Sequence, residues 1–290
     1  MRSRKLKISL ATALTLTGLI LYYFSLPSPL FNDPYSTVLK SNEGEILSAS
    51  IAKDGQWRFP EVDTVPQKFS EALIAYEDKR FYRHPGIDLL SLARAVKQNL
   101  ADGRIVRGGS TITMQVVRLS RKGKPRTVFQ KGIEILLATR LEFRHSKQEI
   151  LGLYASHAPF GGNVVGLEAA CWRYFGRNPQ EISWGEAALL AVLPNAPALI
   201  HPGKNRDQLK EKRDWLLDKL VSTGKIDAFT GSLAKDEMIP EEPKALPRYA
   251  RHLLVRAMKE GHSEDFINST ISKSLQERTE QILQDHHQRL

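Results

Sequence analysis

The chain has a single cysteine, and its sequence shows no spacing typical of a metal site. Its single cysteine, Cys171, excludes an internal disulfide framework, and its position in Ala169-Ala170-Cys171-Trp172 suits a small buried core residue. Its histidines show no metal-ligand spacing with cysteine or acidic partners. Aromatic residues make up only 8% of the 290 residues, while 41% are apolar. These values are ordinary for a globular protein and say little more about its class.

No charged residue occurs between Ile8 and Leu26, a stretch of 19 residues. A helix of that length can just cross a hydrocarbon core of roughly 30 Å. The residues before it are basic, with no acidic residue among them: Arg2, Arg4, Lys5 and Lys7. We therefore predict a cytoplasmic tail at 1–7, a transmembrane anchor at 8–26 and export of the rest. A cleaved signal peptide is the alternative, but its apolar region is usually shorter and ends in an A-x-A pattern, which is absent here.

The formal charge is +10, with 42 basic and 32 acidic residues. Setting aside the four basic residues of the tail leaves 38 basic residues against 32 acidic ones, a surplus of +6. Such a surplus suits anionic headgroups or pyrophosphates as readily as nucleic acid. Nucleic-acid binding would rest on charge alone and conflicts with the predicted export, so no nucleic-acid partner is predicted.

The segment 35–60 predicts β structure, and the segment after it predicts helices. Short apolar runs lie on either side of Asn42-Glu43-Gly44 and predict a small β-hairpin or meander. From about Ser70 the apolar spacing is helical and leads to Glu77, which we expect at the C-terminal end of a helix. Asp88 is placed to cap the next helix.

Helical patterns continue through the rest of the chain. A long helix is expected over 127–144, and the run 187–193 predicts a buried helix because it is apolar around most of its circumference. Two capping boxes mark further helix starts, Ser146 with Glu149 and Ser183 with Glu186. A proline-rich change in composition indicates a boundary near 235, which separates a main domain at 61–235 from a linker at 236–290.

Two segments carry the residues suited to chemistry. The first is Glu77-Asp78-Lys79-Arg80-Phe81-Tyr82-Arg83-His84-Pro85-Gly86-Ile87-Asp88, and the second is Gly108-Gly109-Ser110-Thr111-Ile112-Thr113-Met114-Gln115. Glu77 is a candidate base, and the aromatic residues Tyr76, Phe81 and Tyr82 near it are expected to desolvate its carboxylate and raise its affinity for a proton. In the second segment, the glycines permit backbone conformations closed to other residues, and the hydroxyls can cap a helix whose backbone donors face an anion.

These segments resemble the first two motifs of glycosyltransferase family 51, the peptidoglycan polymerase domain of class A penicillin-binding proteins: E-D-x-x-F-x-x-H-x-G and G-G-S-T-I-T-x-Q. Lys131 and Glu134 match the K-x-x-E of its third motif, and Lys147 begins a partial match to the fourth. Met114 and the segment 158–162 fit the penicillin-binding protein 1C group. The resemblance implies a mainly α, lysozyme-like glycosyltransferase domain with a small N-terminal β-hairpin and one N-terminal transmembrane helix.

The resemblance also implies roles for individual residues. Glu77 deprotonates the 4-hydroxyl of the acceptor sugar, which attacks the lipid II donor with inversion to a β-1,4 linkage and releases undecaprenyl pyrophosphate. Glu134 is the second catalytic carboxylate and binds a divalent cation, Mg²⁺ or Mn²⁺, that holds the pyrophosphate. The implied substrate-binding residues are Ser110, Thr111, Gln115, Arg118 and Lys131. The implied structural residues at the site are His84, Gly108 and Gly109.

Several departures from the family pattern keep alternatives open. Gly152 stands where the family has Glu, Ser156 replaces Asn, and Gln130 replaces an Arg. They permit a catalytically impaired relative that binds lipid II or acts as a cell-wall scaffold. A glycan-cleaving, lysozyme-like enzyme is a further alternative, but it would not need Lys131 and Arg118.

The complete transpeptidase signature, S-x-x-K followed by S-x-N and K-T-G, does not occur in this sequence. We therefore expect a chain without the transpeptidase domain that the family usually carries. Its expected partners are lipid II, the growing glycan strand, the bacterial inner membrane, and a transpeptidase or other cell-wall synthesis proteins. The N-terminus is expected in the cytoplasm and the catalytic domain in the periplasm.

Overall fold

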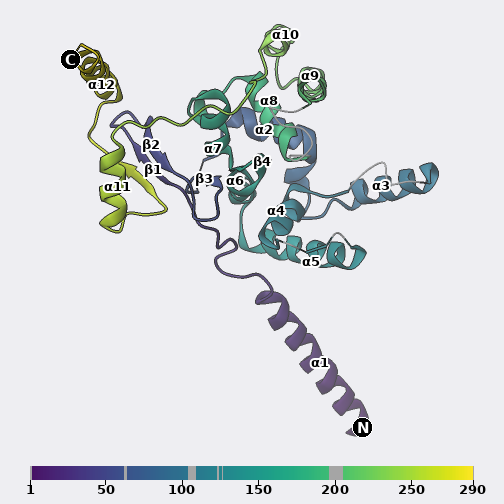
Figure 1. The fold of residues 1–290 in the computed structure, drawn as a ribbon. Coiled ribbons are helices and arrows are strands. Elements are labelled where there is room, and N and C mark those ends of the chain that lie inside the picture. Colours follow the sequence, from purple (N-terminus) through teal and green to yellow (C-terminus); the bar gives the residue numbers. More distant parts are fainter. Residues whose placement is uncertain are drawn as a thin grey trace. The chain divides into compact units, whose positions relative to one another are not determined.

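Two compact units make up the chain in the computed structural model, which describes residues 2–61, 64–103, 109–122, 124–125, 127–195 and 205–289. The first unit comprises residues 1–32 and 80–150, and the second comprises residues 33–79 and 151–290. Helices dominate both units, and the strands form two small sheets (Figure 1). The mainly α class expected from the sequence is therefore confirmed.

The first unit is built from helices. They are α1 (Arg2–Tyr23), the 3-10 turn η1 (Phe81–Arg83), α3 (Leu89–Asp102), α4 (Ile112–Ser120), α5 (Val128–Arg144) and α6 (Lys147–His157), the last of which continues into the second unit. The helices α4 and α5 lie against each other (Figure 1). Ile112 and Val116 of α4 and Leu137 and Leu141 of α5 are buried. Each pair is four residues apart, the spacing that forms one apolar stripe on a helix.

Short-range hydrogen bonds fix the helix starts of the first unit. The Asp88 carboxylate accepts a hydrogen bond of 2.9 Å from the Ser91 backbone N–H, and Thr127 accepts one of 3.2 Å from the Gln130 N–H. Both residues satisfy a donor that the first turn of a helix leaves without an intrahelical partner. The cap predicted at Asp88 and the helix start predicted near Thr127 are therefore confirmed.

Helix α1 covers most of the segment for which a transmembrane anchor was predicted, 8–26, and ends at Tyr23. Within the part of the chain that the structure describes, no helix is both long enough and apolar enough to cross a membrane. The structure thus confirms a helix in this segment but does not confirm that it spans a membrane. Arg140 of α5 donates a hydrogen bond of 3.0 Å to the carbonyl of Tyr23, so the end of α1 is tied to α5.

Helix α8 lies at the centre of the second unit. The helices of this unit are α2 (Gln67–Glu77), α7 (Leu167–Ala170), the π-helical turn η2 (Cys171–Phe175), η3 (Pro179–Glu181), α8 (Trp184–Val192), η4 (Leu193–Asn195), α9 (Arg206–Ser222), α10 (Ala228–Asp236), α11 (Arg251–Lys259) and α12 (Lys273–His287). Helices α2, α9 and α10 all contact α8, and its residues 187–192 are buried. The predicted capping box of Ser183 and Glu186 is present with both hydrogen bonds. The buried helix expected from the apolar run is therefore confirmed.

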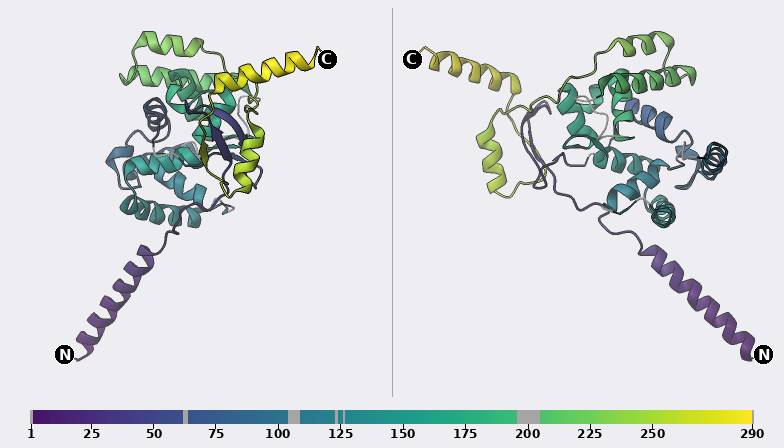
Figure 2. Two further views of the ribbon diagram at one scale, coloured as in Figure 1. Left: turned by 90° about the vertical axis from the view of Figure 1, so that its left-hand side faces the viewer. Right: turned by 45° about the vertical axis from the view of Figure 1, so that its right-hand side comes forward.

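One three-stranded sheet contains the predicted hairpin. Its strands are β1 (Thr37–Lys40), β2 (Ile46–Ser50) and β6 (Phe266–Asn268), in the order β2-β1-β6. The pair β1-β2 is antiparallel, which confirms the hairpin, whereas β6 pairs with β1 in parallel. Helix α11 packs on this sheet (Figure 2). Leu39, Leu47 and Leu254 form the core of this part of the unit. Part of the predicted linker 236–290 therefore shares a sheet with the N-terminal hairpin.

The second sheet decides between the two alternatives for 35–60, a hairpin or a meander, in favour of the hairpin. Its strands are β3 (Trp57–Arg58), β4 (Pro159–Gly161) and β5 (Val164–Val165), in the order β3-β5-β4. Trp57 pairs in parallel with Val164, so β3 does not extend the hairpin. The alternation near Trp57 predicts a strand but not its partner, because the partner lies more than a hundred residues further along the chain.

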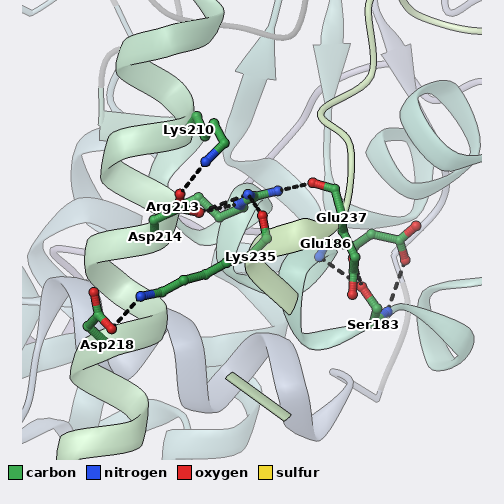
Figure 3. Close-up of polar contacts among 8 residues, drawn as sticks. All are labelled: Ser183, Glu186, Lys210, Arg213, Asp214, Asp218, Lys235 and Glu237. Carbon is green, nitrogen blue, oxygen red and sulfur yellow. Dashed lines mark hydrogen bonds and ion pairs between the residues drawn. The ribbon is translucent and has the colours of Figure 1, made fainter. Parts of the chain in front are cut away.

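A buried arginine ties α9 to the end of α10 (Figure 3). Arg213, with a relative exposure of 1%, donates hydrogen bonds of 2.5 Å to the Glu237 carbonyl and 2.6 Å to the Lys235 carbonyl. These carbonyls belong to the end of a helix, where backbone acceptors lack intrahelical partners. The Glu237 side chain in turn accepts a hydrogen bond of 2.5 Å from the Ser183 hydroxyl at the start of α8. This network fixes α9 relative to α8 and α10.

Candidate active site

The first unit gathers two cations around Ser110, just before α4. The Ser110 hydroxyl accepts hydrogen bonds from Arg118, at 3.2 Å, and from the Lys131 ammonium. Arg118 lies on α4 and Lys131 on α5, so the packing of these two helices brings both side chains to one hydroxyl. Two positive groups converging on a small polar residue suit an anionic ligand.

Glu134 completes this group, which we call the Ser110 cluster: Ser110, Arg118, Lys131 and Glu134. The Arg118 Nε and Nη2 atoms donate to the two carboxylate oxygens of Glu134 at 2.9 and 2.8 Å, a bidentate pair. Glu134 is buried, with a relative exposure of 8%. The structure therefore brings together four of the residues that the sequence nominated.

The Ser110 cluster contains one carboxylate, that of Glu134, as a candidate ligand for the expected divalent cation. Both oxygens of Glu134 already accept hydrogen bonds from Arg118. Among the residues that the structure describes, no three or more His, Cys, Asp or Glu side chains are arranged to hold a metal ion. We therefore assign no step to a metal, and the expected dependence on Mg²⁺ or Mn²⁺ stays a prediction.

Thr111 holds the two motif segments of the first unit together. It is buried, accepts a hydrogen bond of 3.1 Å from the Met114 N–H as the cap of α4, and donates one of 2.6 Å to the Gly86 carbonyl. Gly86 has φ of +88°, and a Cβ there would lie 2.7 Å from the Ala138 carbonyl oxygen of α5. Only glycine fits this approach without moving the backbone. In this structure, the hydroxyl of Thr111 serves the scaffold.

Three other nominated residues are near α4 in the sequence: Gln115, Gly109 and Gly108. Gln115 lies half-buried on α4. A Cβ at Gly109 would lie 3.1 Å from the Cα of Leu92, so this glycine lets the turn pass close to α3. Gly108 lies outside the described residues. Substrate contact by Gln115 stays a prediction.

Glu142 is a site residue that the sequence did not single out. Lys147 donates hydrogen bonds of 2.7 Å to the Glu142 carboxylate and 2.8 Å to the His84 carbonyl, and Thr113 donates one of 2.6 Å to the same Glu142 oxygen. His84 is buried and packs edge-on against Phe81, with ring centroids 6.4 Å apart. These contacts support the structural role expected for His84.

Glu77 ends α2 in the second unit, as the sequence predicted. Burial raises the pKa of Tyr76 to about 12, and the charge of Glu77 is the second cause of this rise. Burial also raises the pKa of Tyr154 on α6 well above its ordinary value, and the charges of Glu77 and Tyr76 add to this effect. Tyr76 and Tyr154 are therefore close neighbours of Glu77. Phe81 and Tyr82, which were expected to help desolvate it, belong to the first unit.

Lys219 of α9 lies against the last turn of α2, and the sequence did not nominate it. Its ammonium donates a hydrogen bond to the carbonyl of Ala75, two residues before Glu77 on α2. Its pKa is lowered to about 8, first by burial and second by the charge of Lys79, while the charge of Glu77 acts in the opposite direction. The end of α2 thus carries the candidate base beside a half-buried cation.

The departures from the family pattern lie on two helices. Gly152 and Ser156 are buried on α6, whereas Gln130 lies in the first turn of α5. The carbonyl of Ser156 faces Gly166, where a Cβ would lie 2.7 Å from that oxygen. The structure gives no reason for glycine at 152.

A family model described as Transglycosylase matches residues 43–221, which include both motif segments and the Ser110 cluster. The chain belongs to the Transglycosylase family, and the resemblance to glycosyltransferase family 51 is confirmed. Membership agrees with a mainly helical unit that carries small sheets, as expected for a lysozyme-like glycosyltransferase domain.

Its relatives include several penicillin-binding proteins. Penicillin-binding protein 1C of Escherichia coli (strain K12) is 37% identical over 265 residues, which cover 91% of this chain and 34% of that protein. Penicillin-binding protein 1A of Pseudomonas aeruginosa is 39% identical over 175 residues, covering 60% and 21%. A crystal structure of penicillin-binding protein 1A from Haemophilus influenzae matches 84% of this chain and 28% of that one, with 18% identity and a TM-score of 0.42, too weak a likeness to place elements. The chain spans about a third or less of the length of these relatives.

Proposed function

We propose that the chain is a peptidoglycan glycosyltransferase that polymerises lipid II into β-1,4-linked glycan strands and releases undecaprenyl pyrophosphate. The observation that carries this proposal is the Ser110 cluster, which lies within the matched Transglycosylase region. A departing pyrophosphate develops negative charge that positioned cations stabilise. Arg118 and Lys131 supply two such cations at one hydroxyl.

Glu77 is the base in this proposal. It deprotonates the 4-hydroxyl of the acceptor's terminal sugar, and the oxygen attacks the anomeric carbon of the donor from the face opposite the pyrophosphate. The C–O bond between the anomeric carbon and the pyrophosphate breaks as the new bond forms. Because the attack comes from the opposite face, the configuration of the anomeric carbon inverts. A base must be ionised when the acceptor arrives. The neutral phenols of Tyr76 and Tyr154 limit the water around this carboxylate, because both side chains are at least half-buried.

We also propose that the chain works at the bacterial inner membrane, single-pass, with its catalytic domain on the periplasmic side. The support is the uncharged stretch 8–26 preceded by four basic residues. A lipid-linked donor would then lie in the same membrane as the enzyme. A transpeptidase or another cell-wall synthesis protein is the proposed partner that crosslinks the product.

The first test is polymerisation by the detergent-solubilised chain. Labelled lipid II is incubated with the parent and with Glu77→Gln, with and without EDTA, and the products are resolved by length on a gel. Glu71→Gln is the matched control, because it removes a carboxylate from the same helix, six residues earlier. We expect a ladder from the parent and from the control, and none from Glu77→Gln.

Each other outcome changes the proposal. A ladder from Glu77→Gln would show that another group is the base. No ladder from any protein, with lipid II binding retained, would favour the catalytically impaired binder that the departures at 130, 152 and 156 permit. Loss of the parent's ladder in EDTA, restored by Mg²⁺ or Mn²⁺, would establish the metal dependence.

A further inference from the structure

We propose that Lys219 is a positioning residue for glycosyl transfer: its ammonium, held against the last turn of α2, keeps the Glu77 carboxylate ionised and therefore competent as a base. This inference rests on the function proposed above for Glu77. It assigns a task to a residue that lies 142 positions further along the chain.

Two contacts hold the Lys219 ammonium in place, and a third positions the aromatic ring that it lies against. It donates a hydrogen bond to the Ala75 carbonyl on α2 and lies 4.7 Å from the centre of the Trp215 ring, one turn earlier on α9. The Trp215 ring meets Tyr76 edge-on at 6.2 Å, and Tyr76 adjoins Glu77. An ammonium over an aromatic face is stabilised as a cation. The contacts therefore keep a positive charge at the end of α2.

The charge is maintained at the pH at which the enzyme is expected to work. Burial lowers the pKa of Lys219 to about 8, helped by Lys79 and opposed by Glu77. A lysine with that pKa is still roughly nine-tenths protonated near pH 7. The interaction with Glu77 is mutual, because two coupled groups change each other's protonation by the same free energy.

The two tyrosines beside this carboxylate do not supply a positive charge. Tyr76, on the same helix, and Tyr154, on α6, both have raised pKa values and are neutral at physiological pH. Lys79 is exposed, so water screens its charge more strongly. Lys219 is a half-buried cation on α9, the helix that packs on α2, and its ammonium contacts the Ala75 carbonyl of α2.

The test is the pH dependence of kcat/KM for lipid II polymerisation, from about pH 5 to about pH 9. Lys219→Met keeps the length of the side chain and removes its charge, and Lys219→Arg keeps a cation. Lys225→Met is the matched control, because Lys225 also pairs with α2, at 2.7 Å from Glu71, but in the first half of the helix. We expect the acidic limb of the Lys219→Met profile to move up by roughly one pH unit.

At the acidic end Lys219→Met should therefore be about tenfold slower than the parent, with little difference on the alkaline plateau. Lys219→Arg and Lys225→Met should keep the parental limb. An equal loss at every pH, or no rescue by arginine, would overturn the inference and leave Lys219 with a structural role only. If instead Glu77→Gln still polymerises, the proposed base is wrong, whatever the Lys219 variants do.

Discussion

Replacing Arg118 by Met should expose how much the Ser110 cluster depends on its bidentate pair. The substitution leaves the buried Glu134 carboxylate without two hydrogen bonds, of 2.9 and 2.8 Å. Breaking a fully buried pair from one side costs about 3–5 kcal/mol. The Arg118 side chain is 34% exposed and that of Glu134 11%, so water compensates part of the loss. We expect a loss of roughly 2 kcal/mol in local stability.

The companion variants separate the pair from its surroundings. Glu134→Gln removes the charge but keeps a similar shape, and it should cost about 1 kcal/mol. The double variant leaves no unpaired charge, so its effect should be smaller than the sum of the two single effects by at least about 1 kcal/mol.

The assay must report on the first unit. All four tryptophans lie in the second unit, so their fluorescence does not serve: Trp57, Trp172, Trp184 and Trp215. Amide hydrogen exchange of the peptides that cover α4 and α5 measures local opening directly. A loss of about 2 kcal/mol corresponds to exchange roughly thirtyfold faster in Arg118→Met. Strictly additive effects in the double variant would refute the reasoning, because the two side chains would then not act as a pair.

Two further predictions concern the scaffold around the cluster. Gly86→Ala should lower the free energy of unfolding by at least about 2 kcal/mol, because its Cβ would lie 2.7 Å from the Ala138 carbonyl oxygen. Gly103→Ala is the comparison: its φ is also positive, at +63°, but the space around it is open, so it should cost only about 1 kcal/mol. Melting temperatures measure both losses. Hydrogen bonds from Arg80 and Ser91 outweigh burial and hold the pKa of Asp88 well below its usual range. The stabilisation by Asp88 is then complete above about pH 4 and is lost as pH falls through the folded-state pKa. The difference in melting temperature between Asp88→Asn and the parent should be largest near neutral pH. It should shrink in acid, where the parent loses the contribution of the Asp88 carboxylate.

Local features of the fold could be predicted from the sequence because their partners are close along the chain. The cap at Asp88 bonds a residue three positions on, and Ser183 and Glu186 form a capping box over the same distance. The hairpin of β1 and β2 closes over five residues. Such interactions depend on residue type and spacing alone.

Pairings over long separations could not be predicted in this way. Trp57 reads as a strand residue, but nothing near it indicates that Val164 is its partner. The same holds for β6, which joins the sheet of the N-terminal hairpin from the predicted linker. A two- or three-residue strand has no hydrophobic pattern long enough to specify its register.

The candidate site also combines a relation that follows from spacing with one that depends on the packing of distant helices. Lys131 and Glu134 are three residues apart, so their shared helix face follows from spacing. Lys219 has no such relation to Glu77, yet it lies beside Leu216 and Leu220, both fully buried. A lysine at the edge of a buried stripe usually extends its ammonium to water. The sequence therefore gives no reason to single out Lys219, and only the packing of α9 on α2 brings its ammonium to the helix end that carries the candidate base.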